Sequence, residues 1–204
     1  AISSHLTLLT GIAGINVYIV RILKLPFDIS LHFYFFFFVG VIITGILKMF
    51  FYSSVGAGFL GTLGSSALLY VSIHWIILGN TINIPLLYIQ GLLLGFGASM
   101  TLVSGSMATL LDGDLKEAAQ RSQTMHTIRN FSAAMLIPII AYTIKNHIQK
   151  GTQSIYAENI TDKMIYLKKL QDVAIDADHQ IFLLMIIFNM VMFVSSIIQM
   201  ILGK

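Results

Sequence analysis

Residues 55–78 read VGAGFLGTLGSSALLYVSIHWIIL, and residues 84–107 read IPLLYIQGLLLGFGASMTLVSGSM. Neither stretch contains Asp, Glu, Lys or Arg, and each is longer than the roughly 20 residues that a helix needs to cross a bilayer core of about 30 Å. The residues between them, 79–83, have the composition of a turn. The two stretches therefore predict a pair of antiparallel transmembrane helices.

Four further apolar stretches of similar length lie on either side of this pair. The six predicted spans are residues 6–23, 31–51, 55–78, 84–107, 128–144 and 181–202. The chain of 204 residues is 56% hydrophobic and only 10% charged, with a mean hydropathy of +0.84, whereas soluble domains are about 25% charged. The sequence therefore predicts an all-α membrane protein with six transmembrane helices and the lipid bilayer as a partner.

The composition also argues against several kinds of chemistry. The chain has no Cys, which removes disulfides, thiolate catalysis and Cys-bound metals. Its six His residues show no metal-ligand spacing, and its net charge of +3 comes without a clustered basic face. We therefore expect no metal, no cofactor and no nucleic-acid partner. We also do not expect an enzyme, because no nucleophile is accompanied by an acid/base cluster.

The acidic residues all lie outside the six predicted spans. They are Asp28, Asp112, Asp114, Glu117, Glu158, Asp162, Asp172, Asp176 and Asp178. Acids at membrane depth usually belong to a proton or ion relay, so the sequence predicts no such relay within this chain. His74 lies in a span beside Trp75, where it is either a titrating switch or an anchor at the headgroup level.

Two segments between the spans are polar. Residues 112–127 predict the start of a helix, which Asp114 can cap and in which Glu117 and Arg121 can pair at i and i+4. Residues 146–178 are predicted to form an extramembrane loop, either solvated or carrying a short interfacial helix. The chain opens within an apolar stretch without Met or a basic segment. We therefore predict no signal peptide and expect the latter portion of a longer polypeptide.

Small residues and one proline indicate how the helices pack. Gly91, Gly95 and Gly97 form a small-residue stripe of the kind that lets membrane helices approach closely. The glycines at 56, 58 and 61 have the spacing of a dinucleotide-binding loop, but no strand precedes them, so they also indicate packing. Pro138 lies in the middle of the fifth span and predicts a kink.

Three motifs in the second half of the chain carry a resemblance to a known family. They are QGLLLGFG at residues 90–97, EAAQRS at 117–122 and HTIRNFS at 126–132. Together they resemble the late part of major facilitator superfamily transporters, most closely the fourteen-helix drug:proton antiporters. On this resemblance the six spans are similar to one half of such a transporter, its C-terminal bundle.

The resemblance implies a secondary active transporter in the cytoplasmic (inner) membrane of a bacterium, one that exports amphipathic small molecules by alternating access. It implies that a missing N-terminal half is a partner and supplies the proton coupling. It gives Arg129 a structural role at the opening of a helix. The residues that it implies for substrate binding are Asn16, Tyr18, Gln90, Met100 and Tyr142. The alternative is a non-catalytic integral-membrane subunit that packs within a larger membrane complex.

Overall fold

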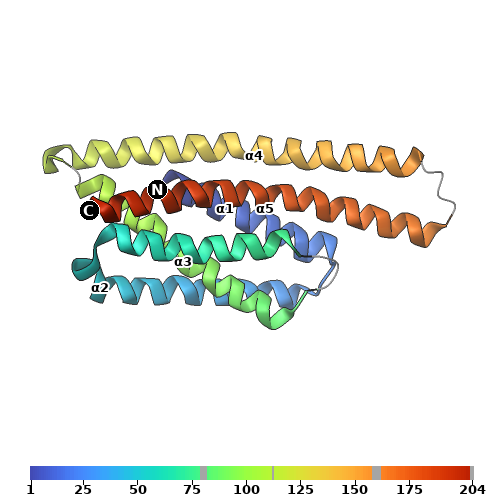
Figure 1. Ribbon diagram of the computed structural model, residues 1–204, viewed down its shortest axis with the longest axis horizontal. Helices are drawn as coiled ribbons and strands as arrows, with labels where there is room; N and C mark the ends of the chain where they lie inside the picture. Colours follow the sequence, from blue (N-terminus) through green and yellow to red (C-terminus); the bar gives the residue numbers. More distant parts are fainter. Residues whose placement is uncertain (79–81, 112, 158–161, 203–204) are drawn as a thin grey trace.

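The computed structural model describes residues 1–78, 82–111, 113–157 and 162–202, and every regular element in these ranges is a helix. The predicted turn at 79–83 falls largely on residues 79–81, which lie outside the described residues. The elements are α1 (Ile2–Asn16), the π-helix η1 (Val17–Ile22), α2 (Phe27–Ile76), α3 (Ile84–Leu111), the 3-10 helix η2 (Leu115–Glu117), α4 (Ala118–Ala157) and α5 (Lys163–Ile201). Figure 1 shows the long helices running along the long axis of the molecule.

Helix α2 consists of two arms that meet at Gly56. This residue has φ 75° and ψ 168°, a conformation that glycine adopts at little cost and that interrupts the helix. The rings of Phe33 and Trp75 lie 6.3 Å apart, although a straight helix would separate them by about 63 Å. The arms, residues 27–55 and 57–76, therefore run antiparallel beside each other (Figure 1).

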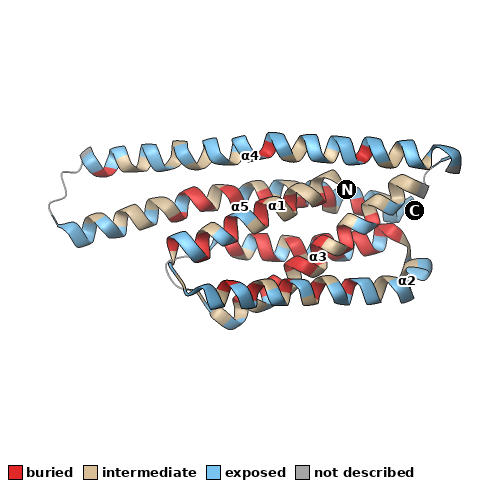
Figure 2. Ribbon diagram, turned by 180° about the vertical axis from the view of Figure 1, so that it is seen from behind, coloured by how far each residue is buried: buried red, intermediate tan, exposed pale blue. Residues whose placement is uncertain are grey.

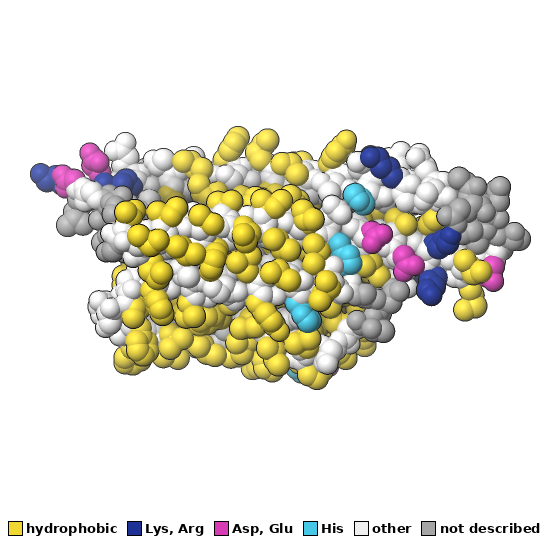
Figure 3. All heavy atoms as spheres, viewed as in Figure 1, with side chains coloured by type: hydrophobic (Ala, Val, Ile, Leu, Met, Phe, Trp, Pro, Cys, Tyr) yellow, Lys and Arg dark blue, Asp and Glu magenta, His cyan; other side chains and the backbone are white. Residues whose placement is uncertain are grey.

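Five helices in the described ranges are long and apolar enough to cross a membrane, with α1 and η1 taken together and the two arms of α2 taken as one. The predicted all-helical class is therefore confirmed for the described residues. Many exposed residues of these helices are apolar as well, among them Phe35 at 62% exposed, Ile42 at 61% and Met49 at 83%. Figure 3 shows apolar side chains covering the flank of the bundle and charged ones gathering at its two ends, the surface expected of a helical membrane bundle.

The core lies where α1, η1, both arms of α2, α3 and α5 meet. Its largest fully buried side chains are Tyr18, Phe33, Trp75 and Phe182. Figure 2 shows the buried residues concentrated between these elements, whereas α4 is mostly exposed or half-buried. Helix α4 thus lies along the outside of the bundle.

Helices α4 and α5 are much longer than the sequence indicated. Residues 146–157 belong to α4 and residues 163–178 to α5, so the described residues of the segment predicted at 146–178 are helical, over a longer range than the short helix that the sequence allowed. Figure 1 shows this pair continuing beyond the other helices. The prediction ended the helices where hydropathy falls, but Lys and Gln are good helix formers in water. We call residues 145–157 and 163–173 the α4–α5 projection.

The projection is held together by contacts between its two helices. A Cβ atom on Gly151 would lie 2.5 Å from Cγ1 of Val173, and the rings of Tyr156 and Tyr166 are 6.1 Å apart. At its far end, the side chain of Asp162 caps α5 by accepting a 2.7 Å hydrogen bond from the Met164 amide.

The other polar segment forms as predicted. The Asp114 carboxylate accepts a 3.0 Å hydrogen bond from the Lys116 amide, where η2 leads into α4. Glu117 and Arg121 pair at 3.5 Å across one helical turn. The Arg121 guanidinium also donates to the carbonyl of Asp114 at 2.7 Å. Asp112 lies outside the described residues.

Candidate functional site

Helices α1 and α5 meet along a seam of small residues facing large ones. A Cβ atom on Gly14 would lie 2.7 Å from Cε1 of Phe182, and one on Gly11 would lie 3.1 Å from Cε of Met185. Moving three residues forward along α1, from Gly11 to Gly14, moves the contact three residues back along α5, from Met185 to Phe182. The two helices are therefore antiparallel. We call the facing positions the α1–α5 seam. In facing order they are Thr7, Gly11, Gly14 and Tyr18 on the first helix and Asn189, Met185, Phe182 and Asp178 on α5.

Asp178 is the only acidic side chain buried within the described part of the bundle. It is 1% exposed, and neither carboxyl oxygen has a hydrogen-bond partner. Tyr18, which is fully buried, follows Gly14 by one turn and interacts electrostatically with Asp178. An isolated carboxylate is costly to bury, so the site requires either a proton or a counter-ion.

The structure buries Asp178 in the bundle, whereas the sequence analysis placed every acidic residue outside the predicted spans. The sequence placed Asp178 in a loop, three residues before the last predicted span, but α5 begins at Lys163 and carries this side chain into the core. A signal was present in the sequence. Asp178, Phe182, Met185 and Asn189 follow one another at intervals of four, three and four residues, so the apolar stripe of the last span could have been extended backwards to the acid.

An aromatic layer surrounds the Asp178 end of the seam. The indole Nε1 of Trp75 donates a 2.8 Å hydrogen bond to Oε1 of Gln90. The Trp75 ring lies 5.3 Å from that of Phe182, one turn from Asp178. Nε2 of Gln90 is buried and has no hydrogen-bond partner. This layer therefore links α2, α3 and α5 and contains a second buried polar atom that is available to a ligand.

A second polar layer lies two turns further along the seam, where the register places Thr7 level with Asn189. Both are fully buried. Nδ2 of Asn189 donates to the Leu68 carbonyl at 3.2 Å and to Oγ of Ser72 at 3.1 Å. Oγ1 of Thr7 and Oδ1 of Asn189 have no hydrogen-bond partner. Both ends of the seam thus contain polar atoms that the protein leaves unpaired.

The helix that carries Tyr18 is itself unusual. Residues Val17–Ile22 form a π-helix, in which the Leu23 amide donates to the Tyr18 carbonyl at 2.9 Å. A π-segment accommodates one more residue in a turn than an α-helix does, and such segments are frequent at functional sites. Its position beside Asp178 makes this end of the seam the candidate functional site.

The structure brings together two of the five residues predicted to bind substrate. Gln90 accepts a hydrogen bond from Trp75, and Tyr18 belongs to the buried cluster that contains Trp75 and Phe182; both residues are buried. Met100 is fully buried elsewhere, where its Cβ atom would lie 2.7 Å from a Cβ on Gly64. Asn16 is exposed, and Tyr142 on α4 is 70% exposed.

The residues predicted to be structural lie at helix contacts or within α4. Gly91 and Gly95 face the first arm of α2, and Gly97 faces Gly64 in the second arm. Arg129 donates to Nδ1 of His126 at 2.9 Å. Pro138 lies inside α4, which runs on through it to Ala157. His74, the other candidate in a span, stacks at 6.0 Å on the ring of Tyr70.

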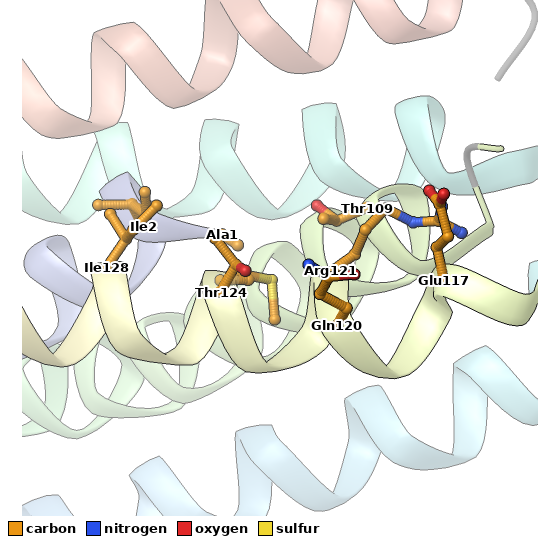
Figure 4. A pocket seen from close by; sticks show the side chains of 9 residues that line it. Ala1, Ile2, Thr109, Glu117, Gln120, Arg121, Thr124 and Ile128 are labelled. Atoms are coloured by element: carbon orange, nitrogen blue, oxygen red, sulfur yellow. The ribbon is translucent and has the colours of Figure 1, made fainter. Parts of the chain in front are cut away.

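A pocket of about 630 Å³ lies away from this site, between the start of α1, the end of α3 and the start of α4. Figure 4 shows Arg121, Glu117 and Thr109 along one side and Ile2 and Ile128 at the other. None of the five predicted substrate-binding residues lines it. Its arginine is already engaged by backbone carbonyls and by Glu117, so the unpaired groups of the seam are the better candidates for binding.

No family model, curated protein or solved structure matches this chain. Among the described residues, no group of three or more His, Asp or Glu side chains could hold a metal ion. The buried polar groups of the seam are therefore the features from which a function can be inferred.

Proposed function

We propose that the chain is a membrane-embedded part of a secondary active transporter that couples proton movement to the export of amphipathic small molecules. One observation carries the proposal. Asp178 is buried in a bundle with an apolar exterior, and both of its oxygens are unpaired. A buried acid among apolar helices is costly, and in membrane proteins such residues usually bind protons, ions or substrate.

The neighbours of Asp178 support the substrate class. Tyr18, Trp75 and Phe182 provide aromatic surface, and Met185 provides a flexible thioether one turn further along the seam. Aromatic faces and methionine accept apolar groups of many shapes, and aromatic rings also attract cations. An amphipathic molecule with a cationic group would therefore find both of its preferred contacts when the seam opens.

The sequence motifs add a family to the same proposal. We propose that the chain is the C-terminal half of a major facilitator superfamily transporter in the bacterial cytoplasmic membrane, with six spans and an N-terminal half as its partner. Transport occurs by alternating access, without covalent chemistry. Asp178 takes up a proton from one side and releases it to the other, so at least part of the coupling resides in this half.

The test measures proton exchange in membrane vesicles that contain the protein, with ethidium as the amphipathic cation and a pH-sensitive dye inside. Ethidium should drive proton movement through the wild-type protein, and Asp178→Asn should abolish it. Asp176→Asn is the matched control, because Asp176 is exposed and lies two residues away on the same helix. It should retain exchange.

Two results would overturn the proposal. One is an absence of ethidium-driven proton movement through the wild-type protein, and the other is an equal rate in Asp178→Asn and Asp176→Asn. Either result would favour the non-catalytic membrane subunit.

A further inference from the structure

Arg21 follows Tyr18, the η1 residue that interacts with Asp178, by three residues. It belongs to the last turn of η1, and its side chain is exposed. If the antiparallel pairing that places Tyr18 opposite Asp178 continues, Arg21 lies opposite residue 175 of α5, one helical turn from Asp178. A turn rises by about 5.4 Å, a distance that a long arginine side chain can span.

The π-conformation of η1 is what turns Arg21 away from the seam. In an α-helix, residues at i and i+3 share a face, so Tyr18 and Arg21 would both border the seam. The wider turn of a π-helix needs more residues to return to the same face, and here Tyr18, Ile19 and Ile22 are buried while Arg21 is exposed. Tightening η1 into an α-helix would therefore rotate Arg21 towards Asp178.

The other elements around Asp178 supply few competing charges. On α5 itself, Nε2 of His179 is 2.8 Å from the Leu78 carbonyl and is engaged there. The second arm of α2 presents the uncharged Trp75 layer. The contact of Gly151 with Val173 places Lys145 and His147 of α4 at about the level of Asp178. Asp178 faces α1, whereas Val173 faces α4, so these two groups lie beside another face of α5.

We infer that Arg21 is the counter-ion of Asp178 after the carboxyl group loses its proton, and that a change of η1 from π- to α-helix brings it there. This inference rests on the proposed role of Asp178 as a proton site. Protonated Asp178 is neutral and leaves η1 in the π-conformation seen here. Release of the proton to water creates a buried carboxylate, which draws the guanidinium into the seam. The charge state of one side chain is thereby converted into a rotation of the helix that lines the site.

Infrared titration of the protein in liposomes tests the inference without a transported substrate. The carboxylic-acid band that is lost in Asp178→Asn identifies the residue, and its pH midpoint is measured in each variant. An opposite charge within a few ångströms of an acid changes its midpoint by about 1 to 3 pH units. Arg21→Gln should therefore raise the midpoint by about one unit or more, and Arg21→Lys should largely restore it.

Lys24→Gln is the matched control, since Lys24 is an exposed cation three residues further on, in the turn before α2. It should leave the midpoint unchanged. The sequence has no Cys, so Arg21→Cys can be modified selectively. A cationic aminoethyl thiosulfonate should lower the raised midpoint, and a neutral methyl thiosulfonate should not.

Equal midpoints in Arg21→Gln and wild type, equal shifts in Arg21→Gln and Lys24→Gln, or equal effects of the two thiol reagents would each overturn the role of Arg21. The ethidium assay is independent of these results. A titrating band that responds to Arg21 in a protein without ethidium exchange would refute the transport proposal and keep the ion pair.

Discussion

Glycines form both the contact between α2 and α3 and the seam between α1 and α5. At the α2–α3 contact they face backbone atoms, and on the seam they face side chains. A Cβ atom on Gly91 would lie 2.8 Å from the carbonyl oxygen of Phe33, and one on Gly95 would overlap the carbonyl of Phe37. On the seam, a Cβ on Gly14 or Gly11 would meet only outer side-chain atoms, those of Phe182, Met185 and Leu94. Backbone cannot move aside as a side chain can.

The two regions also differ in how most of their polar groups are paired, although Nε2 of Gln90 is unpaired at the α2–α3 contact. At the α2–α3 contact, Oγ1 of Thr44 donates to the carbonyls of Gly40 and Phe96, and Nζ of Lys48 donates to the Ser99 carbonyl at 2.5 Å. On the seam, the carboxyl of Asp178 and Oδ1 of Asn189 are unpaired. The comparison suggests a fixed frame formed by α2 and α3, against which the seam can change its contacts.

The largest effect should come from adding one methyl group to the frame. Gly95→Ala places a Cβ against the Phe37 carbonyl, so one of the two helices must shift and the folded protein should lose about 3 kcal/mol. Gly45→Ala is the control, because nothing lies within 4 Å of a Cβ there and alanine favours the helix. Thermal unfolding in detergent micelles measures both. Equal stability of the two variants would show that α2 and α3 do not form a rigid contact.

A smaller loss is expected when the hydrogen bond between α2 and α3 is removed. Trp75→Phe leaves Oε1 of Gln90 without its donor in a site where Nε2 is already unpaired, which should cost about 1 to 2 kcal/mol. Adding Gln90→Leu removes the unpaired amide and should recover part of the loss. A double mutant less stable than Trp75→Phe alone would contradict this account. The same unfolding measurement provides the comparison.

The seam should tolerate the substitution that the frame does not. Gly14→Ala brings a Cβ to 2.7 Å from Cε1 of Phe182, the far end of a side chain. The ring can turn aside, and alanine gains about 1 kcal/mol of helix propensity over glycine, so we expect a net loss of about 1 kcal/mol. A loss as large as that of Gly95→Ala would remove the distinction between the two regions. Unfolding of both variants under one condition decides between these outcomes.

The helical class was predictable because long apolar stretches admit few other structures in lipid. The packing roles of Gly91 and Gly95 followed from their spacing and agree with their contacts on α2. The lengths of α4 and α5 were not predictable from hydropathy, since a polar helix and a polar loop have similar compositions. The two arms of α2 overlap the second and third predicted spans, but the reversal of the chain at Gly56 alone was not predicted.

The candidate site was predictable only in part. Tyr18 and Gln90 were singled out as polar residues within spans. Gln90 accepts a hydrogen bond from Trp75, and Tyr18 belongs to the buried cluster that contains Trp75 and Phe182. Asp178 was missed because its burial is decided by α1, which lies some 160 residues earlier in the chain. The local sequence around Asp178 is polar and resembles a solvated segment. Only the register of the seam shows that its side chain points inward.

The smallest expected effect on stability is also the most informative one. Asp178→Asn keeps the shape of the side chain and removes a group whose oxygens make no hydrogen bond, so its stability should lie within about 1 kcal/mol of the wild type. Thr44→Val in the frame removes a hydroxyl that donates to two carbonyls and should cost about 1 kcal/mol. Removing the hydrogen-bonding group of a structural residue such as Thr44 lowers the free energy of unfolding. If unfolding in micelles shows that Asp178→Asn is clearly less stable than Thr44→Val, Asp178 stabilises the fold, and its proposed role as a proton-binding site is contradicted. If Asp178→Asn is instead stable and inactive, the cost of burying an unpaired acid is best explained by transport.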